Sequence, residues 1–131
     1  MSREWQQTRM SEYVMPNAVY YQSIWAVRDL DRMEQRLREL TRAAMQAAVG
    51  VLNESETGYK ESKTEHKAME AAILSERVEG IRNSLTEVPE RYRICILDNI
   101  MYNEPVRFPG KLWKLWKQKF LYRVAVNLSL M

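Results

Sequence analysis

The chain has 131 residues, which is enough for one compact domain, or for one domain with an extended helical arm, and too few for two enzyme folds. Gly and Pro number only four each, so the local preference is helical along nearly the whole chain, and no stretch alternates as a strand would. The single cysteine excludes an internal disulfide framework, and no run reaches the ~18 apolar residues of a membrane span. We therefore expect an all-α protein that is cytoplasmic.

Charge is distributed unevenly along the chain. Residues 105–131 contain six Lys and Arg and no acid, so this basic segment carries +6. Residues 1–104 contain fourteen Lys and Arg against seventeen Asp and Glu, a net charge of −3. This asymmetry indicates an acidic scaffold with a basic end that attracts anions.

A polar leader, residues 1–16, comes first, and Pro16 and Asn17 then open a helical pattern that continues to about residue 52. Apolar residues within this pattern recur at a three-four spacing and form one stripe: Leu30, Met33, Leu37, Leu40, Ala44, Ala47 and Val51. A helix of this length would span roughly 50 Å, which a small core cannot cover. It must therefore pack on another helix or on another subunit.

Gly50 and a charged loop near 53–63 end this first helix. Ser62 and Glu65 match the S-x-x-E capping pattern and predict the start of a second helix. Its apolar residues again share one face: Ala71, Leu74, Val78, Ile81, Leu85 and Val88. Two such helices predict an antiparallel hairpin over residues 17–88. The alternative is a first helix that pairs with its own copy in a dimer.

A third helix is predicted from Pro89, which suits a first helical position, with Glu90 in the first turn. Nearly all faces from Tyr92 to Tyr102 are apolar, so this helix should be central and buried. Cys95 would then be a packing residue with an inert thiol.

The last helix is predicted over residues 111–128, after a connection rich in proline, residues 103–110. At 100° per residue, one stripe contains Trp113, Trp116, Phe120 and Val124, which should face the core. The opposite side contains Lys111, Lys114 and Gln118, while Lys117, Lys119 and Arg123 flank the stripe. A cationic outer face on a docked helix is typical of a DNA-binding helix.

The side-chain chemistry divides these residues into two sets. Glutamine can read adenine, and lysine can reach guanine or phosphate, so we expect base contacts from Lys111, Lys114 and Gln118. The remaining cations should neutralise phosphates: Arg107, Lys117, Lys119 and Arg123. Two alternatives remain open, a helix lying on a membrane surface and a core helix with a solvated lysine face.

Catalytic chemistry finds little support in the sequence. The only histidine, His66, lies between two charged residues near a helix start, where an exposed imidazole is expected. A second histidine, a cysteine pair and a glycine-rich phosphate loop are all missing from the sequence. We therefore expect a protein that is not an enzyme, with no cofactor and no metal.

Three blocks of the chain resemble the RinA-like transcriptional regulators of phages and prophages of Gram-positive bacteria. They are YYQSIWAVRDLDRM at 20–33, VPERYR at 88–93 and WKQKFLYRVA at 116–125, and the likeness covers most of residues 19–126. The resemblance implies a small DNA-binding activator whose C-terminal half is similar to region 4 of primary sigma factors. In that module one helix supports a short second helix and a third enters the major groove.

Carried onto this chain, the resemblance makes residues 89–102 the supporting helix and residues 111–128 the reader. Only Asn103 to Gly110 separate the two, which is too short for a standard second helix. Either a single turn replaces that helix, or the geometry differs from that of the sigma module.

The sequence thus predicts an all-α fold with a long N-terminal helical hairpin, residues 17–88, and a helix-turn-helix-like unit, residues 89–131, within one compact domain. We expect a regulator of phage or prophage genes in the cytoplasm of a bacterial host. Its partners would be duplex DNA and RNA polymerase, with no membrane, and a homodimer could form through the Leu30–Val51 stripe. The alternative is a phage assembly protein whose basic end binds DNA or protein without sequence preference.

Overall fold

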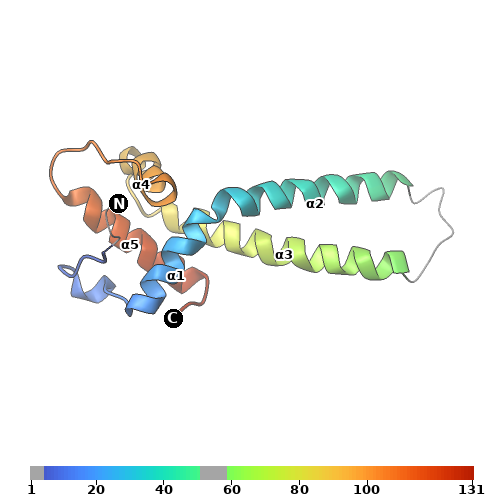
Figure 1. The fold of residues 1–131 in the computed structure, drawn as a ribbon, viewed down its shortest axis with the longest axis horizontal. Helices are drawn as coiled ribbons and strands as arrows, with labels where there is room; N and C mark the ends of the chain where they lie inside the picture. The colour runs from blue at the N-terminus through green and yellow to red at the C-terminus, as the bar shows by residue number, and fades with distance from the viewer. Residues whose placement is uncertain (1–4, 51–58) are drawn as a thin grey trace. The chain divides into compact units, whose positions relative to one another are not determined.

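The structure is a computed structural model that describes residues 5–50 and 59–131. Within these residues the fold is all-helical, as the sequence predicts (Figure 1). The elements in chain order are a 3-10 turn η1 (Ser11–Tyr13), α1 (Asn17–Arg28), α2 (Leu30–Gly50), α3 (Tyr59–Leu85), α4 (Glu90–Tyr102) and α5 (Leu112–Asn127).

The chain divides into two compact units. One consists of Met1–Asp29 together with Glu79–Met131, and the other is Leu30–Val78. The sequence pattern divides the chain at residues 17 and 89, whereas the contacts divide it at residues 30 and 79. The leader and α1 therefore belong with α4 and α5.

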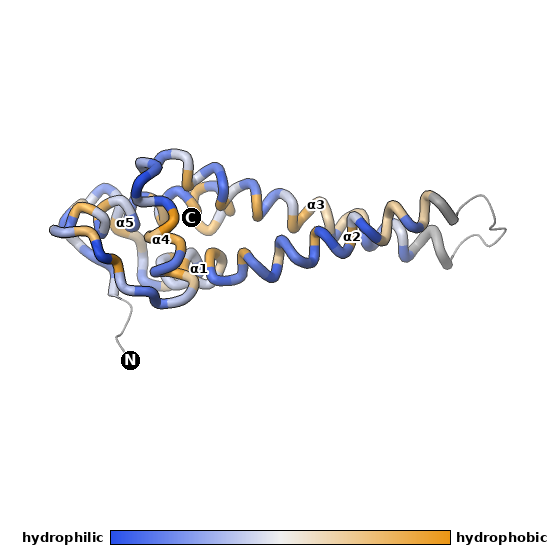
Figure 2. Tube along the Cα trace, turned by 90° about the horizontal axis from the view of Figure 1, so that it is seen from above, coloured by the Kyte–Doolittle hydropathy of each residue, from blue (hydrophilic) through white to orange (hydrophobic). Residues whose placement is uncertain are grey.

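In the Leu30–Val78 unit, α2 and the first part of α3 run side by side (Figure 1). Figure 2 shows polar and apolar residues alternating along both helices, as expected where each has one apolar side. Leu40 and Leu74 are buried, and Arg36 bonds Glu70 on the facing helix with both guanidinium nitrogens, Nε–Oε1 at 2.7 Å and Nη2–Oε2 at 3.1 Å. A bidentate pair of this kind adds geometric specificity to the contact between the two helices.

The prediction of one unbroken helix over residues 17–52 is wrong, because the helix is interrupted at Asp29. The backbone N–H of Asp29 bonds both Trp25 O at 3.0 Å and Ala26 O at 3.2 Å, and its ψ is 0°. The preceding Arg28 side chain bonds Ile100 O at 2.9 Å at the end of α4. This long-range contact holds the end of α1 on α4, and Asp is a weak helix former.

Only part of the Leu30–Val51 stripe is buried. Leu30, Met33 and Leu40 are buried, whereas Ala44 and Ala47 are exposed. Val51 lies outside the described residues.

The second helix begins earlier than the capping pattern predicts. α3 starts at Tyr59, so Ser62 lies inside the helix and is not its N-cap. Of the predicted loop near 53–63, residues 59–63 are helical, and residues 53–58 lie outside the described part of the chain.

The other unit packs α1, α4 and α5 together around one core. Fully buried apolar side chains from these three helices include Ile24, Val27, Ile96, Ile100, Phe120, Leu121 and Val124. The C-terminal end of α5 bonds to the last turns of α3, where Asn127 Nδ2 donates to Ser84 Oγ at 2.9 Å. These contacts hold the middle and the C-terminal end of α5.

α4 begins one residue later than predicted, because Pro89 is the N-cap residue before Glu90 and not the first helical residue. It is not buried on all faces. Tyr92, Ile96 and Ile100 face the core, but Ile94 is 75% exposed. The prediction of a helix buried on all faces is therefore wrong, because only every fourth residue, at positions 92, 96 and 100, is buried.

The connection between α4 and α5, residues 103–111, contains no helix. It starts at Asn103, which ends α4 in the left-handed conformation with φ 56° and donates its N–H to Asn99 O at 3.1 Å. The sequence analysis expects either a single helical turn in place of the second helix or a geometry unlike that of the sigma module. Residues 103–111 contain no such turn.

Candidate nucleic-acid interface

The exposed cations of α5 gather at its first turn. Lys111 is the N-cap residue of the helix and Lys114 lies in its first turn, and both side chains are exposed. The free backbone N–H groups of a helix start carry partial positive charge of the same sign. This end of α5 is therefore strongly electropositive.

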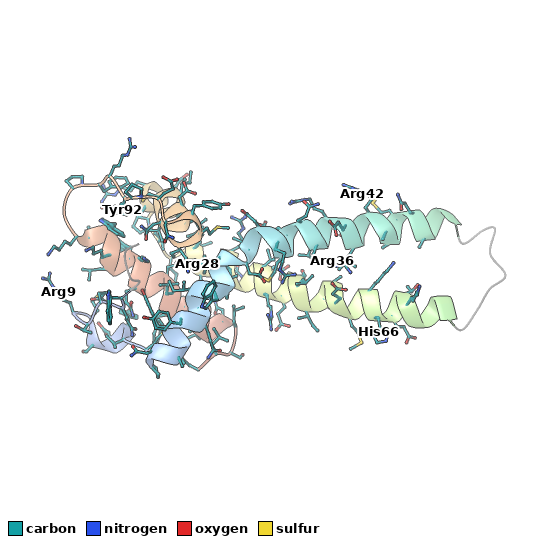
Figure 3. The ribbon with its side chains drawn as sticks, viewed as in Figure 1. Arg9, Arg28, Arg36, Arg42, His66 and Tyr92 are labelled. Atoms are coloured by element: carbon teal, nitrogen blue, oxygen red, sulfur yellow. The ribbon has the colours of Figure 1, made fainter. Side chains whose placement is uncertain are left out.

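A third cation comes from the leader. Arg9 lies beside the two lysines, and together they border a cavity of about 430 Å³. The lining residues are Gln7, Thr8, Arg9, Lys111, Leu112, Lys114 and Leu115, with no carboxylate among them. We call Arg9, Lys111 and Lys114 the cation cluster; Figure 3 shows Arg9 projecting from the leader.

The prediction that Gln118 lies on the outer face of the helix is wrong. Its side chain is only 2% exposed, and its Nε2 donates to Gln6 Oε1 at 2.8 Å and to Tyr13 O. The leader lies over this side of α5 and makes an edge contact between the Tyr13 and Tyr122 rings, with centroids 5.3 Å apart. Gln118 is thus a structural residue in this conformation and faces no solvent.

The expected inner stripe is correct only in part. Phe120 and Val124 are buried, but Trp113 and Trp116 are half-buried. The buried side of α5 also includes Leu121 and Ala125. Compared with the predicted stripe, the buried side of α5 is therefore rotated around the helix axis toward the residues that were expected to contact DNA.

Three of the predicted phosphate contacts are engaged within the protein. Lys117 Nζ donates to Asn99 Oδ1 at 2.8 Å, and Arg123 Nε lies 2.8 Å from Glu87 Oε2. Lys119 Nζ lies 5.4 Å from the centre of the Trp116 ring and 5.8 Å from that of Tyr13. These contacts compete with any phosphate for the same charges.

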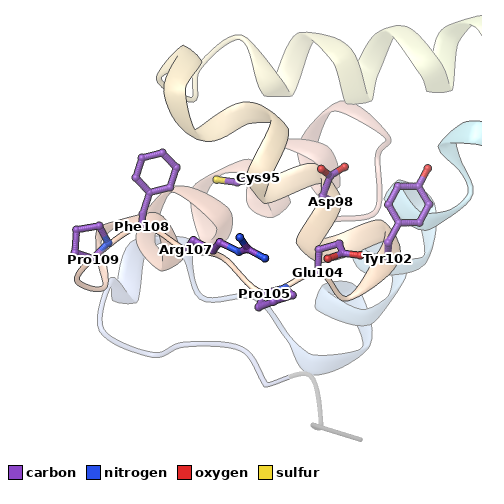
Figure 4. A pocket seen from close by; sticks show the side chains of 8 residues that line it. All are labelled: Cys95, Asp98, Tyr102, Glu104, Pro105, Arg107, Phe108 and Pro109. Carbon is purple, nitrogen blue, oxygen red and sulfur yellow. The ribbon is translucent and has the colours of Figure 1, made fainter.

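Arg107 lies in a second cavity, of about 580 Å³, formed by α4 and residues 104–109 (Figure 4). Its side chain points toward Glu104 and Pro105, and Asp98 also lines the cavity. The two acids offset the single cation, so this cavity does not favour an anion as the cation cluster does.

Arg9 is the member of the cation cluster that the sequence analysis missed. It is one of two arginines in a polar leader with no periodicity, and no local pattern connects it to residues about one hundred positions later. The one available signal was the short polar residues around it, which are typical of a loop.

Other site chemistry is limited. His66 is exposed and lies on the side of α3 away from α2 (Figure 3). Burial raises the pKa of the Cys95 thiol above its ordinary value. Among the described residues, no group of three or more His, Cys, Asp and Glu side chains is placed to bind a metal ion, and no helix has the length and apolarity to cross a membrane.

Comparison with known proteins adds no relative. The chain matches no protein-family model, and neither the curated proteins nor the solved structures give a significant match.

Proposed function

We propose that this protein binds duplex DNA through backbone phosphates at the start of α5 and regulates transcription of phage or prophage genes. The observation that carries DNA binding is the cation cluster, in which three exposed positive side chains border one cavity without an acid. Lys and Arg bind nucleic acids chiefly by neutralising phosphates and releasing counterions. The regulatory role, at promoters with RNA polymerase, rests on the resemblance to RinA-like regulators.

Sequence readout would depend on few residues. With Gln118 buried, the exposed candidates for base contacts are Lys111 and Lys114, which can reach guanine as well as phosphate. Specificity beyond guanine would then come from DNA shape or from a partner protein.

One copy offers few phosphate contacts, so useful affinity at cellular salt needs a second copy or the polymerase. We keep the homodimer through the Leu30–Val51 stripe as our proposal. The part of this stripe that is open to a second copy is the end that contains the exposed Ala44 and Ala47.

A second candidate is a phage assembly protein that binds DNA without sequence preference. The burial of Gln118 favours it, because that residue was the only predicted base reader with both a donor and an acceptor.

The test measures binding to duplex DNA from the regions upstream of neighbouring genes, to random duplex and to anionic liposomes, across a salt series. The regulator predicts tighter binding to the upstream duplex. Equal affinity for both duplexes supports the assembly protein, and binding to liposomes alone excludes both DNA-binding functions.

The key variant is Lys111→Ala/Lys114→Ala, with Lys63→Ala/Lys67→Ala as the control. The control removes two exposed lysines from α3. The slope of log affinity against log salt changes by about 0.9 per phosphate contact, so the first variant should flatten it by about 2 and the control should leave it unchanged. Equal slopes for both variants would exclude the cation cluster as the DNA contact.

A further inference from the structure

The leader folds into a closed loop around one glutamine. The Gln6 side chain pairs with the backbone of Met15 in both directions: Met15 N–H donates to Oε1 at 2.7 Å, and Nε2 donates to Met15 O at 2.8 Å. Inside the loop, Gln7 Oε1 accepts the N–H of Arg9 at 2.8 Å. The backbone at Arg9 is therefore held by specific hydrogen bonds, although the segment has little regular structure.

Gln118 connects this loop to α5 through hydrogen bonds. Its Nε2 donates both to Gln6 Oε1 and to Tyr13 O, at the two sides of the loop. An apolar side chain could fill the same space, but only a donor can fix the position of these two oxygens. The burial of a glutamine in an otherwise apolar helix side is thus explained by the loop that it holds.

The position of the loop determines the position of Arg9. It places Arg9 at the cavity that Lys111 and Lys114 also border, so three residues of like charge line it. Gln7 lines the same cavity, and its Nε2 is buried with no hydrogen-bond partner in the described structure. The repulsion among the three cations would be relieved by an anion in the cavity.

We propose that the leader supplies Arg9 to a composite phosphate site completed by Lys111 and Lys114, and that Gln118 is the positioning residue that holds the leader in place. The ligand is a phosphate group of a nucleic-acid backbone. That choice of ligand rests on the proposed function, whereas the composite site itself rests on the hydrogen bonds and the cavity.

The experiment is a double-mutant cycle on the full chain, with random duplex DNA as the probe. Arg9→Ala should flatten the salt slope by about 1, the loss of one phosphate contact. Gln118→Met, which removes the donor but keeps a similar volume, should flatten it by about the same amount. The double variant should bind like either single variant, because both remove the same contact.

Two exposed positions provide matched controls. Arg38→Ala on α2 removes an arginine, and Gln22→Met on α1 repeats the glutamine substitution. Both should bind DNA as the original protein does. Full additivity in the cycle, or an unchanged slope for Arg9→Ala, would overturn the composite site.

Two further measurements separate the possible failures. If Gln118→Met unfolds, Gln6→Ala opens the same loop from the leader side and should give the same slope. If the original protein binds no DNA, the proposed function fails, and inorganic tripolyphosphate becomes the probe. Arg9-dependent binding of tripolyphosphate keeps the site with a different phosphate source, and its absence overturns the site.

Discussion

Cys95 combines a partly accessible position with a thiol that resists ionisation. Burial raises its pKa above the usual value, and the Sγ donates to Tyr92 O at 3.1 Å. Because only the thiolate reacts quickly, iodoacetamide should alkylate Cys95 more slowly at pH 7.5 than it alkylates a cysteine in a short peptide. Mass spectrometry follows the rate, and the urea-unfolded protein is the control. A folded-state rate equal to that of the peptide would contradict the raised pKa.

Phe120 and Gln118 show which residue positions can be predicted from the sequence and which cannot. Both lie on α5 and both are buried. Apolar spacing assigns Phe120 to the core correctly, since hydrophobicity itself is the signal. Gln118 has the opposite signal, and its burial depends on a leader whose hydrogen bonds to α5 leave no pattern in the sequence. Polar residues held by distant loops are the ones that residue-level reasoning misplaces.

At the scale of elements, helix ends marked by proline were predicted well, whereas the capping pattern at Ser62 predicted the start of α3 wrongly. Pro16, Pro89 and the 103–110 connection delimit helices within a residue or two of the structure, because proline and positive φ act locally. The interruption at Asp29 was not predicted; it coincides with a contact from Arg28 to the end of α4, 72 residues away in the sequence. Tertiary contacts of this kind override local preference.

Asn103 provides a test of one such local signal. It ends α4 with φ 56° and ψ 27°, a conformation that glycine adopts freely and alanine does not. Asn103→Ala should therefore lower the free energy of unfolding by about 1 kcal/mol, whereas Asn103→Gly should stay close to the original protein. Urea denaturation measures both. An alanine variant as stable as the glycine variant would show that the left-handed conformation does not control this helix end.

At the scale of the whole molecule, the net charge of residues 105–131 overestimates how many cations are available on the surface. The sequence places six cations in residues 105–131, but the fold directs Lys117 to Asn99, Arg123 to Glu87 and Arg107 into a cavity with acids. The cation cluster is instead built from residues near both ends of the chain. Composition can predict that such a region exists, but only the fold determines which charges remain available for it.

The two units should also respond separately to the loss of the ion pair between α2 and α3. The hydrogen bond from Arg36 lowers the pKa of Glu70 below its ordinary 4.5, so the pair stabilises the Leu30–Val78 unit above about pH 5. This stabilisation decreases as the pH falls through the folded-state pKa, because the carboxylate then gains a proton.

Glu70→Gln should therefore speed amide hydrogen exchange in α2 and the first part of α3 at pH 7, and the difference from the original protein should shrink below pH 4. Exchange in α1 and α4 should not change, since these helices belong to the other unit. Glu65→Gln, at an exposed glutamate on the same helix, is the control. Faster exchange in α4 as well would mean that the two units unfold together, because a loss confined to one ion pair can spread only through cooperative unfolding.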